Sequence, residues 1–201
     1  MENIENNLVD LLLKNQNNST EIFHFLNPKG ELDQSLSCPD IVKSAGLNAY
    51  TIINSYKVSP AIIIILPQGA NFIKAYFSCL FSGKIAVPLP YKKEFLADDA
   101  FIEHLKLVSK QIKTTLVITD DKIRSVIEEK CFNKFDFYNF NEEEVKEILF
   151  VPIINKNACC LFTSGSTSQP KGVLLSHKNI LTNAQYFTKN YGYTNTTVTV
   201  S

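Results

Sequence analysis

Six consecutive apolar residues, Ala61 to Leu66, constrain the fold of this chain more than any other feature. Four of the six are isoleucines, whose branched β-carbons favour extended backbone. Pro60 and Pro67 bound the run, and no polar residue interrupts it. A short, unbroken, β-branched run of this kind is typical of a central strand in a parallel sheet that is covered on both faces.

Helical and extended patterns alternate along most of the chain. After the isoleucine run, a helix is predicted from about Ala70 to Ser82, with Gly83 at the position of a left-handed C-terminal cap. The other predicted helices cover 39–54, 98–110, 121–130, a short segment from Glu142 and 177–189, and the other predicted strands cover 21–26, 32–37, 84–89, 115–119, 158–162 and 173–175, with a strand or loop at 135–140. This alternation predicts a layered α/β fold with a mostly parallel sheet and flanking helices. The runs at 61–66, 85–89 and 115–119 are expected to be neighbouring central strands.

Composition and charge narrow the functional classes. Lys plus Arg and Asp plus Glu number 20 each in 201 residues, so the net charge is zero. A nucleic-acid-binding surface needs clustered surplus cations, so the zero net charge argues against such a surface. A single small phosphate site remains compatible with this charge balance. The five cysteines form no C-x-x-C pair, which indicates reduced, buried thiols rather than a disulfide framework or a zinc site. With no signal peptide and no transmembrane segment in the pattern, we expect a cytoplasmic protein.

The segment that carries chemistry is the ten-residue string from Thr163 to Gly172, which lies between two predicted strands. Hydroxyl groups in this string can donate hydrogen bonds to phosphate oxygens, a glycine lets the backbone approach a ligand closely, and a lysine adds a point charge. The string has neither the Walker A order G-x-x-x-x-G-K-S/T nor the dinucleotide pattern G-x-G-x-x-G. A polar surface loop is the alternative interpretation for such a composition.

The full string resembles the phosphate-binding loop of the adenylate-forming enzymes, T-S-G-S/T-T-G-x-P-K-G. Eight of its nine specified positions match, and the exception is Ser168, where most members have glycine. The resemblance implies ATP-dependent activation of a carboxylic acid to an acyl-adenylate, with ATP and Mg²⁺ as cofactors. It implies no catalytic residue or metal ligand here, and it implies that the residues that contact phosphate are Thr163, Ser164, Gly165, Ser166, Thr167 and Lys171.

Upstream segments are similar to the fatty acyl-AMP ligase branch of these enzymes. The segments that carry this similarity are Phe25–Gly30, Leu66–Ile73 and Cys79–Pro88. They imply a fatty acid as substrate and an acyl carrier protein as the acceptor of the acyl group. An acyl-CoA synthetase, an adenylation domain of a peptide synthetase and a non-catalytic truncated fragment remain as alternatives.

The resemblance also bears on domain organisation. Residues 1–201 correspond to the N-terminal portion of an AMP-binding (adenylation) domain, with the C-terminal remainder and the lid domain absent. The complete protein is then expected to be a ligase, and these residues alone are expected to be inactive. Two other groups have simpler explanations: a packing or capping role for His177, and a helix cap rather than a metal site at Asp120–Asp121. Ser176 is predicted to be the N-cap of the helix that begins at His177.

Overall fold

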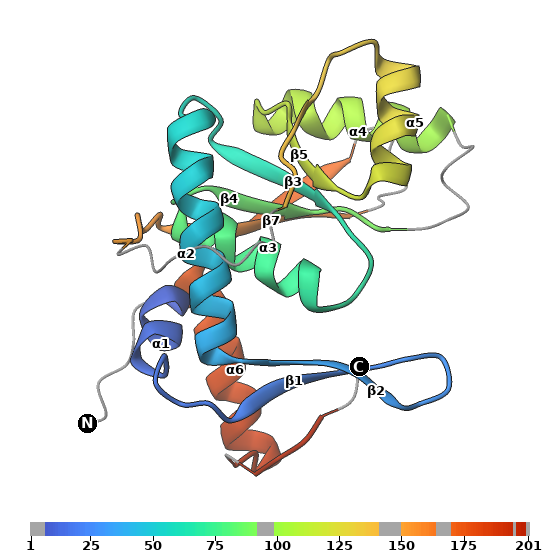
Figure 1. Cartoon of the computed structure of the whole chain (residues 1–201). Coiled ribbons are helices and arrows are strands. Elements are labelled where there is room, and N and C mark those ends of the chain that lie inside the picture. The colour runs from blue at the N-terminus through green and yellow to red at the C-terminus, as the bar shows by residue number, and fades with distance from the viewer. Residues whose placement is uncertain (1–6, 92–98, 141–149, 164–169, 195, 200–201) are drawn as a thin grey trace.

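A computed structural model of the chain describes residues 7–91, 99–140, 150–163, 170–194 and 196–199. Its centre is a six-stranded sheet (Figure 1). The strands, in spatial order, are β6 (Asp136–Phe137), β5 (Leu116–Thr119), β3 (Ala61–Ile65), β4 (Ile85–Pro88), β7 (Asn157–Thr163) and β8 (Lys171–Ser176). Neighbouring strands are parallel except for the antiparallel pair β7–β8. The predicted α/β class and the central trio β5, β3 and β4 are therefore confirmed.

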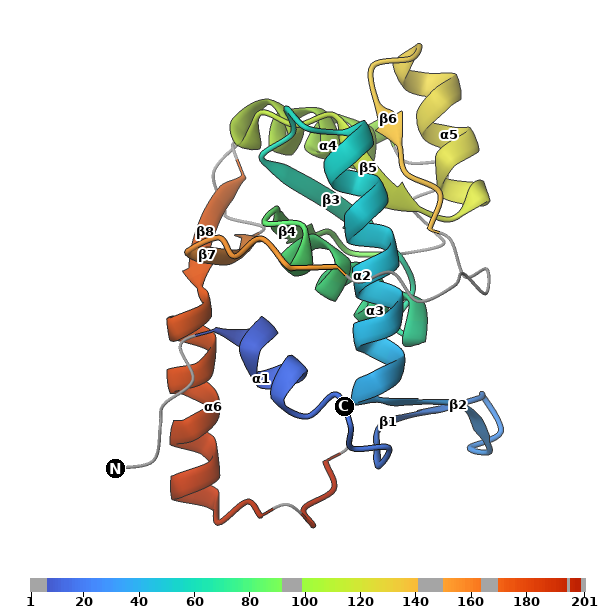
Figure 2. The same ribbon diagram turned by 60° about the vertical axis from the view of Figure 1, so that its left-hand side comes forward.

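The isoleucine run is buried on both faces of this sheet, as its composition predicts. Every residue of β3 is buried. Ile62 and Ile64 pack on the side of α2 (Cys38–Ser55) and α3 (Ala70–Phe81). Ile63 packs on the opposite side, against α4 (Asp99–Ile112) and α5 (Asp121–Cys131). Figure 2 shows the sheet between these two helical layers.

Local hydrogen bonds explain where several helices begin and end. The Ser37 and Asp40 side chains cap the start of α2 reciprocally, which places its first residue one or two positions earlier than predicted. Asp120 is the N-cap of α5 and accepts a hydrogen bond from the Ile123 N–H at 2.9 Å, so its predicted capping role is confirmed. Gly83 has a φ of +69° at the end of α3, as its predicted place in a left-handed cap requires.

The N-terminal segment packs beside the main sheet, where Val9, Leu12 and Leu36 share a buried core with residues of α2 and α3. Helix α1 (Leu8–Lys14) precedes an antiparallel hairpin of β1 (Glu21–Leu26) and β2 (Leu32–Ser37), which does not join the six-stranded sheet. Helix α6 (His177–Tyr191) follows β8 and runs away from the sheet (Figure 2). Among its described side chains, only His177 and Leu181 are buried. The predicted helix from Glu142 lies outside the described residues.

Candidate functional site

The structure places two of the six predicted phosphate-binding residues directly opposite each other. Thr163 is the last residue of β7, Lys171 is the first residue of β8, and the two form a pair in the antiparallel ladder. The Thr163 Oγ1 lies 3.5 Å from the carbonyl oxygen of Lys171, and both residues are exposed. The other four predicted residues, Ser164, Gly165, Ser166 and Thr167, lie outside the described residues. The described part of the site is therefore the base of the β7–β8 hairpin.

Pro170, just before β8, is held by a residue that the sequence analysis did not identify. Its carbonyl oxygen accepts a hydrogen bond of 2.9 Å from the Nε2 of Gln111, near the C-terminal end of α4. Pro170 is buried, although the neighbouring Lys171 is exposed. No motif or periodicity in the sequence joins Gln111 to this hairpin, because the contact depends on how α4 packs over the sheet.

Gly172 has a packing reason for being glycine. It lies opposite Phe162 in the ladder, and an added β-carbon would lie 2.9 Å from the Cys160 Sγ and 2.9 Å from the Phe162 Cζ. Real β-carbons essentially never approach other heavy atoms this closely, so a larger residue would require the Cys160 thiol and the Phe162 ring to shift. The final glycine of the loop pattern therefore lets Phe162 pack closely at the hairpin base.

The cysteines of β7 line the core beneath the hairpin and offer no nucleophile. Cys159 packs on the α2–α3 side of the sheet and Cys160 on the α4–α5 side. Burial raises the pKa of both thiols, so they stay protonated near neutral pH. All five cysteines are free and buried, as the sequence predicts.

His177 has a packing role at the start of α6. Its side chain is 2% exposed, and its Nδ1 accepts a hydrogen bond of 3.2 Å from the N–H of Leu8 in α1. Its Nε2 is buried and has no hydrogen-bond partner among the described residues. Burial lowers its pKa, with a smaller opposing effect from Asp10, so the ring is neutral at pH 7. Ser176 caps the helix as predicted, accepting a hydrogen bond from the N–H of Asn179.

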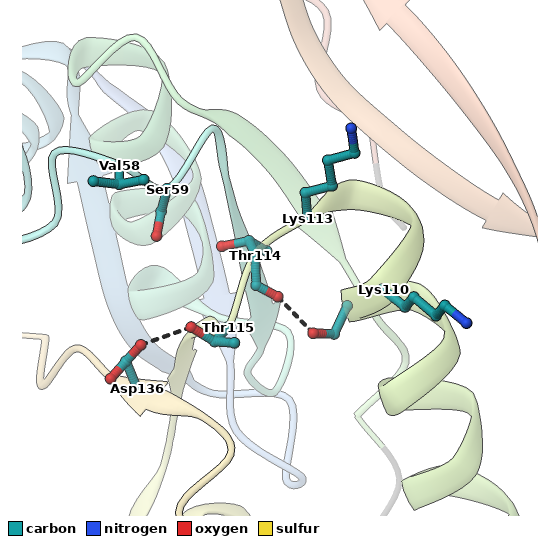
Figure 3. Close-up of a pocket in the computed structure, with 8 residues that line it drawn as sticks. Val58, Ser59, Lys110, Lys113, Thr114, Thr115 and Asp136 are labelled. Carbon is teal, nitrogen blue, oxygen red and sulfur yellow. Dashed lines mark hydrogen bonds between the residues drawn. The ribbon is translucent and has the colours of Figure 1, made fainter.

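Two shallow cavities on the described surface lie away from the pair of Thr163 and Lys171, and neither is lined by a predicted phosphate-binding residue. The larger, about 440 Å³, lies where β3, β5 and β6 begin and α4 ends (Figure 3). Its lining residues are Val58, Ser59, Ser109, Lys110, Lys113, Thr114, Thr115 and Asp136. The smaller, about 340 Å³, lies beside His177. Within the described residues, no three His, Cys, Asp or Glu side chains are grouped to hold a metal ion, and no helix is long and apolar enough to cross a membrane.

Comparison with known proteins agrees with this architecture. The sequence profile of the AMP-binding enzyme family matches residues 33–201. The chain is 26% identical to the medium-chain-fatty-acid–acyl-carrier-protein ligase JamA of Moorena producens, over 95% of this chain and 34% of that protein. It is 27% identical to a 4-hydroxyphenylalkanoate adenylyltransferase of Mycobacterium marinum, over 93% of this chain and 32% of that protein.

Two solved structures share the fold. McyG A-PCP, complexed with phenylalanyl-adenylate, superimposes with a TM-score of 0.82 at 23% identity, over 96% of this chain and 32% of that one. A fatty acyl-adenylate ligase from Legionella pneumophila, in complex with acyl adenylate and pyrophosphate, superimposes with a TM-score of 0.78 at 24% identity, over 95% of this chain and 34% of that one.

The layered sheet and its hairpin thus define an α/β domain of the kind found in adenylate-forming enzymes. This chain belongs to the AMP-binding enzyme family. It spans about a third of the length of the curated relatives it matches.

Proposed function

We propose that this chain supplies the ATP-phosphate-binding part of an enzyme that activates a fatty acid to an acyl-adenylate and transfers it to an acyl carrier protein. The observation that carries the proposal is the loop pattern from Thr163 to Gly172, on a hairpin whose base brings Thr163 and Lys171 together. Family membership and similarity to the ligase JamA support the reaction class and the acceptor.

In the proposed reaction the substrate carboxylate attacks the α-phosphorus of ATP and pyrophosphate leaves. Negative charge develops on the β- and γ-phosphates as the bond breaks. Thr163, Ser164, Ser166 and Thr167 are proposed to donate hydrogen bonds to these oxygens, and Gly165 to let the backbone approach them. Lys171 is proposed to stabilise the leaving group electrostatically. Mg²⁺ is proposed to enter with the nucleotide, whose phosphates usually supply part of its coordination.

We also propose that residues 1–201 form the N-terminal portion of the adenylation domain. The chain spans about a third of JamA, so the groups that bind and orient the acid are expected in the other two thirds of such an enzyme. Positioning of the two reactants contributes much of the rate of such a transfer. This chain by itself is therefore expected to bind phosphate groups without catalysing adenylation.

The first test is ATP binding by the purified chain, measured by isothermal titration calorimetry. Lys171→Ala and Thr167→Ala should each weaken binding by about 1.5–3 kcal/mol, because each removes a hydrogen bond to a charged group. Lys189→Ala, in the last turn of α6, is the matched control and should bind as the wild type does. Equal ATP affinity in wild type, Lys171→Ala and Thr167→Ala would show that the loop is not the phosphate site.

The same preparation tests whether this chain alone can catalyse adenylation. ATP–pyrophosphate exchange with medium- and long-chain fatty acids should stay at the level of the Lys171→Ala variant. Acid-dependent exchange clearly above that level would show that the chain already holds the acid-binding groups.

A further inference from the structure

A hydrogen bond joins the base of the proposed phosphate loop to Gln111 of α4, which lies 59 residues before Pro170 in the chain. The Nε2 of Gln111 donates a hydrogen bond of 2.9 Å to the carbonyl oxygen of Pro170. Proline has no N–H, so this carbonyl is the only main-chain hydrogen-bonding group that Pro170 has. The side chain of Gln111 therefore forms a hydrogen bond with the only main-chain group of Pro170 that can form one.

The bond to Pro170 also orients Lys171. The carbonyl of Pro170 and the nitrogen and Cα of Lys171 belong to one planar peptide unit. Fixing the carbonyl oxygen in space therefore restricts the direction in which the Lys171 side chain leaves the backbone. On its other side, Lys171 is held by its ladder pairing with Thr163. Its main chain is thus anchored on both sides while its side chain remains exposed.

The backbone that carries the exposed Gln111 is fixed to the sheet at the end of α4. Ile112 packs against the core cluster that contains Cys160. The chain then turns at Lys113, which has a φ of +54°, and the buried Thr114 follows. Hydrogen bonds hold Thr114 on both sides: the Ser109 Oγ donates to its carbonyl at 2.6 Å, and its own Oγ1 donates to the carbonyl of Ala61 at 2.7 Å. Figure 3 shows Thr114 beside the end of α4, between the helix and the sheet.

We propose that Gln111 is a positioning residue for Lys171: its side-chain amide holds the Pro170–Lys171 peptide so that the lysine ammonium group is directed at nucleotide phosphate. The inference rests on the proposed function of the loop. It extends the phosphate site to α4, which contributes no residue to the loop pattern. Gln111 itself touches the backbone of the hairpin, so its effect on phosphate passes through Lys171.

The test uses the 201-residue chain and inorganic tripolyphosphate, with dissociation constants measured by calorimetry. Lys171→Ala should weaken binding roughly tenfold or more, from the loss of a charge-assisted hydrogen bond. Gln111→Ala should weaken binding roughly three- to tenfold, because the ammonium group remains but is no longer held in place. Gln185→Ala, on the exposed face of α6, is the matched control and should bind as the wild type does. Urea midpoints of all variants establish that the fold is retained.

The double variant separates positioning from a general effect on structure. If Gln111 acts through Lys171, the Gln111→Ala/Lys171→Ala chain should bind tripolyphosphate no more weakly than Lys171→Ala alone. If the double variant instead loses affinity by the product of the two single-variant factors, Gln111 acts independently of Lys171 and the positioning role is wrong. It is equally wrong if Gln111→Ala binds as the wild type does while Lys171→Ala binds more weakly. If wild type and Lys171→Ala bind equally, or neither binds, the proposed phosphate site falls, and the role of Gln111 falls with it.

Discussion

Substitution of Gly83 by alanine tests the packing between the end of α3 and the segment before β7. Gly83 follows α3 with a φ of +69°. Its N–H donates to the carbonyl of Leu80, and the next N–H, that of Lys84, donates to the carbonyl of Cys79. These two bonds form a Schellman motif, which needs a left-handed residue at this position. An added β-carbon would also lie 2.7 Å from the Ile153 Cγ2 and 3.1 Å from the Ile153 carbonyl oxygen.

The cost of Gly83→Ala therefore has two parts. Left-handed backbone costs a residue with a β-carbon roughly 1–2 kcal/mol. Overpacking against Ile153 adds about 1–3 kcal/mol, because Ile153 is held by a hydrogen bond from its N–H to the carbonyl of Phe81. Gly192 has a similar φ of +66°, with nothing within 4 Å of an added β-carbon. Gly192→Ala is therefore the matched control and should show the first part alone.

The measurement is urea denaturation followed by circular dichroism. With a slope of about 2 kcal/mol per molar urea, Gly83→Ala should lower the midpoint by roughly 1–2.5 M, and Gly192→Ala by roughly 0.5–1 M. Adding Ile153→Ala should recover part of the loss at Gly83, since the contact with the carbonyl oxygen remains. Equal midpoints for the two glycine variants would refute the argument that Ile153 limits the space at Gly83.

Two further predictions concern His177 and β3. Burial lowers the pKa of His177 below its ordinary value of 6.5. As the pH falls through 6.5, the unfolded chain therefore binds more protons than the folded chain, and the free energy of unfolding should decrease below about pH 6.5. His177→Gln keeps an acceptor for the Leu8 N–H, so it should show a smaller fall in urea midpoint between pH 7.5 and 5.5, and an equal fall would contradict the assignment. In native-state hydrogen exchange, the amides of Ala61–Ile65 should be among the slowest in the chain, since β3 is buried and paired on both sides; rapid exchange there would contradict its central position.

The sequence by itself determined the elements that depend on neighbours in the chain. The isoleucine run specified a doubly buried strand, because no polar residue in it can face solvent. Helix starts at Asp120 and Ser176 were predicted for the same local reason, since a cap bonds an N–H three residues away. The loop pattern was likewise identified from consecutive residues, and the structure then placed its first and ninth residues, Thr163 and Lys171, in one ladder pair.

Only the tertiary structure decided which distant segments meet. The bond from Gln111 to Pro170 joins residues 59 positions apart, and the bond from Leu8 to His177 joins residues 169 positions apart. Neither pair carries a sequence signal, because its geometry is set by how helices pack on the sheet. The need for glycine at position 172 likewise comes from the Phe162 ring across the hairpin. Side-chain type and spacing thus determine local structure, whereas contacts that support the loop arise only when packing brings α4, β7 and β8 together.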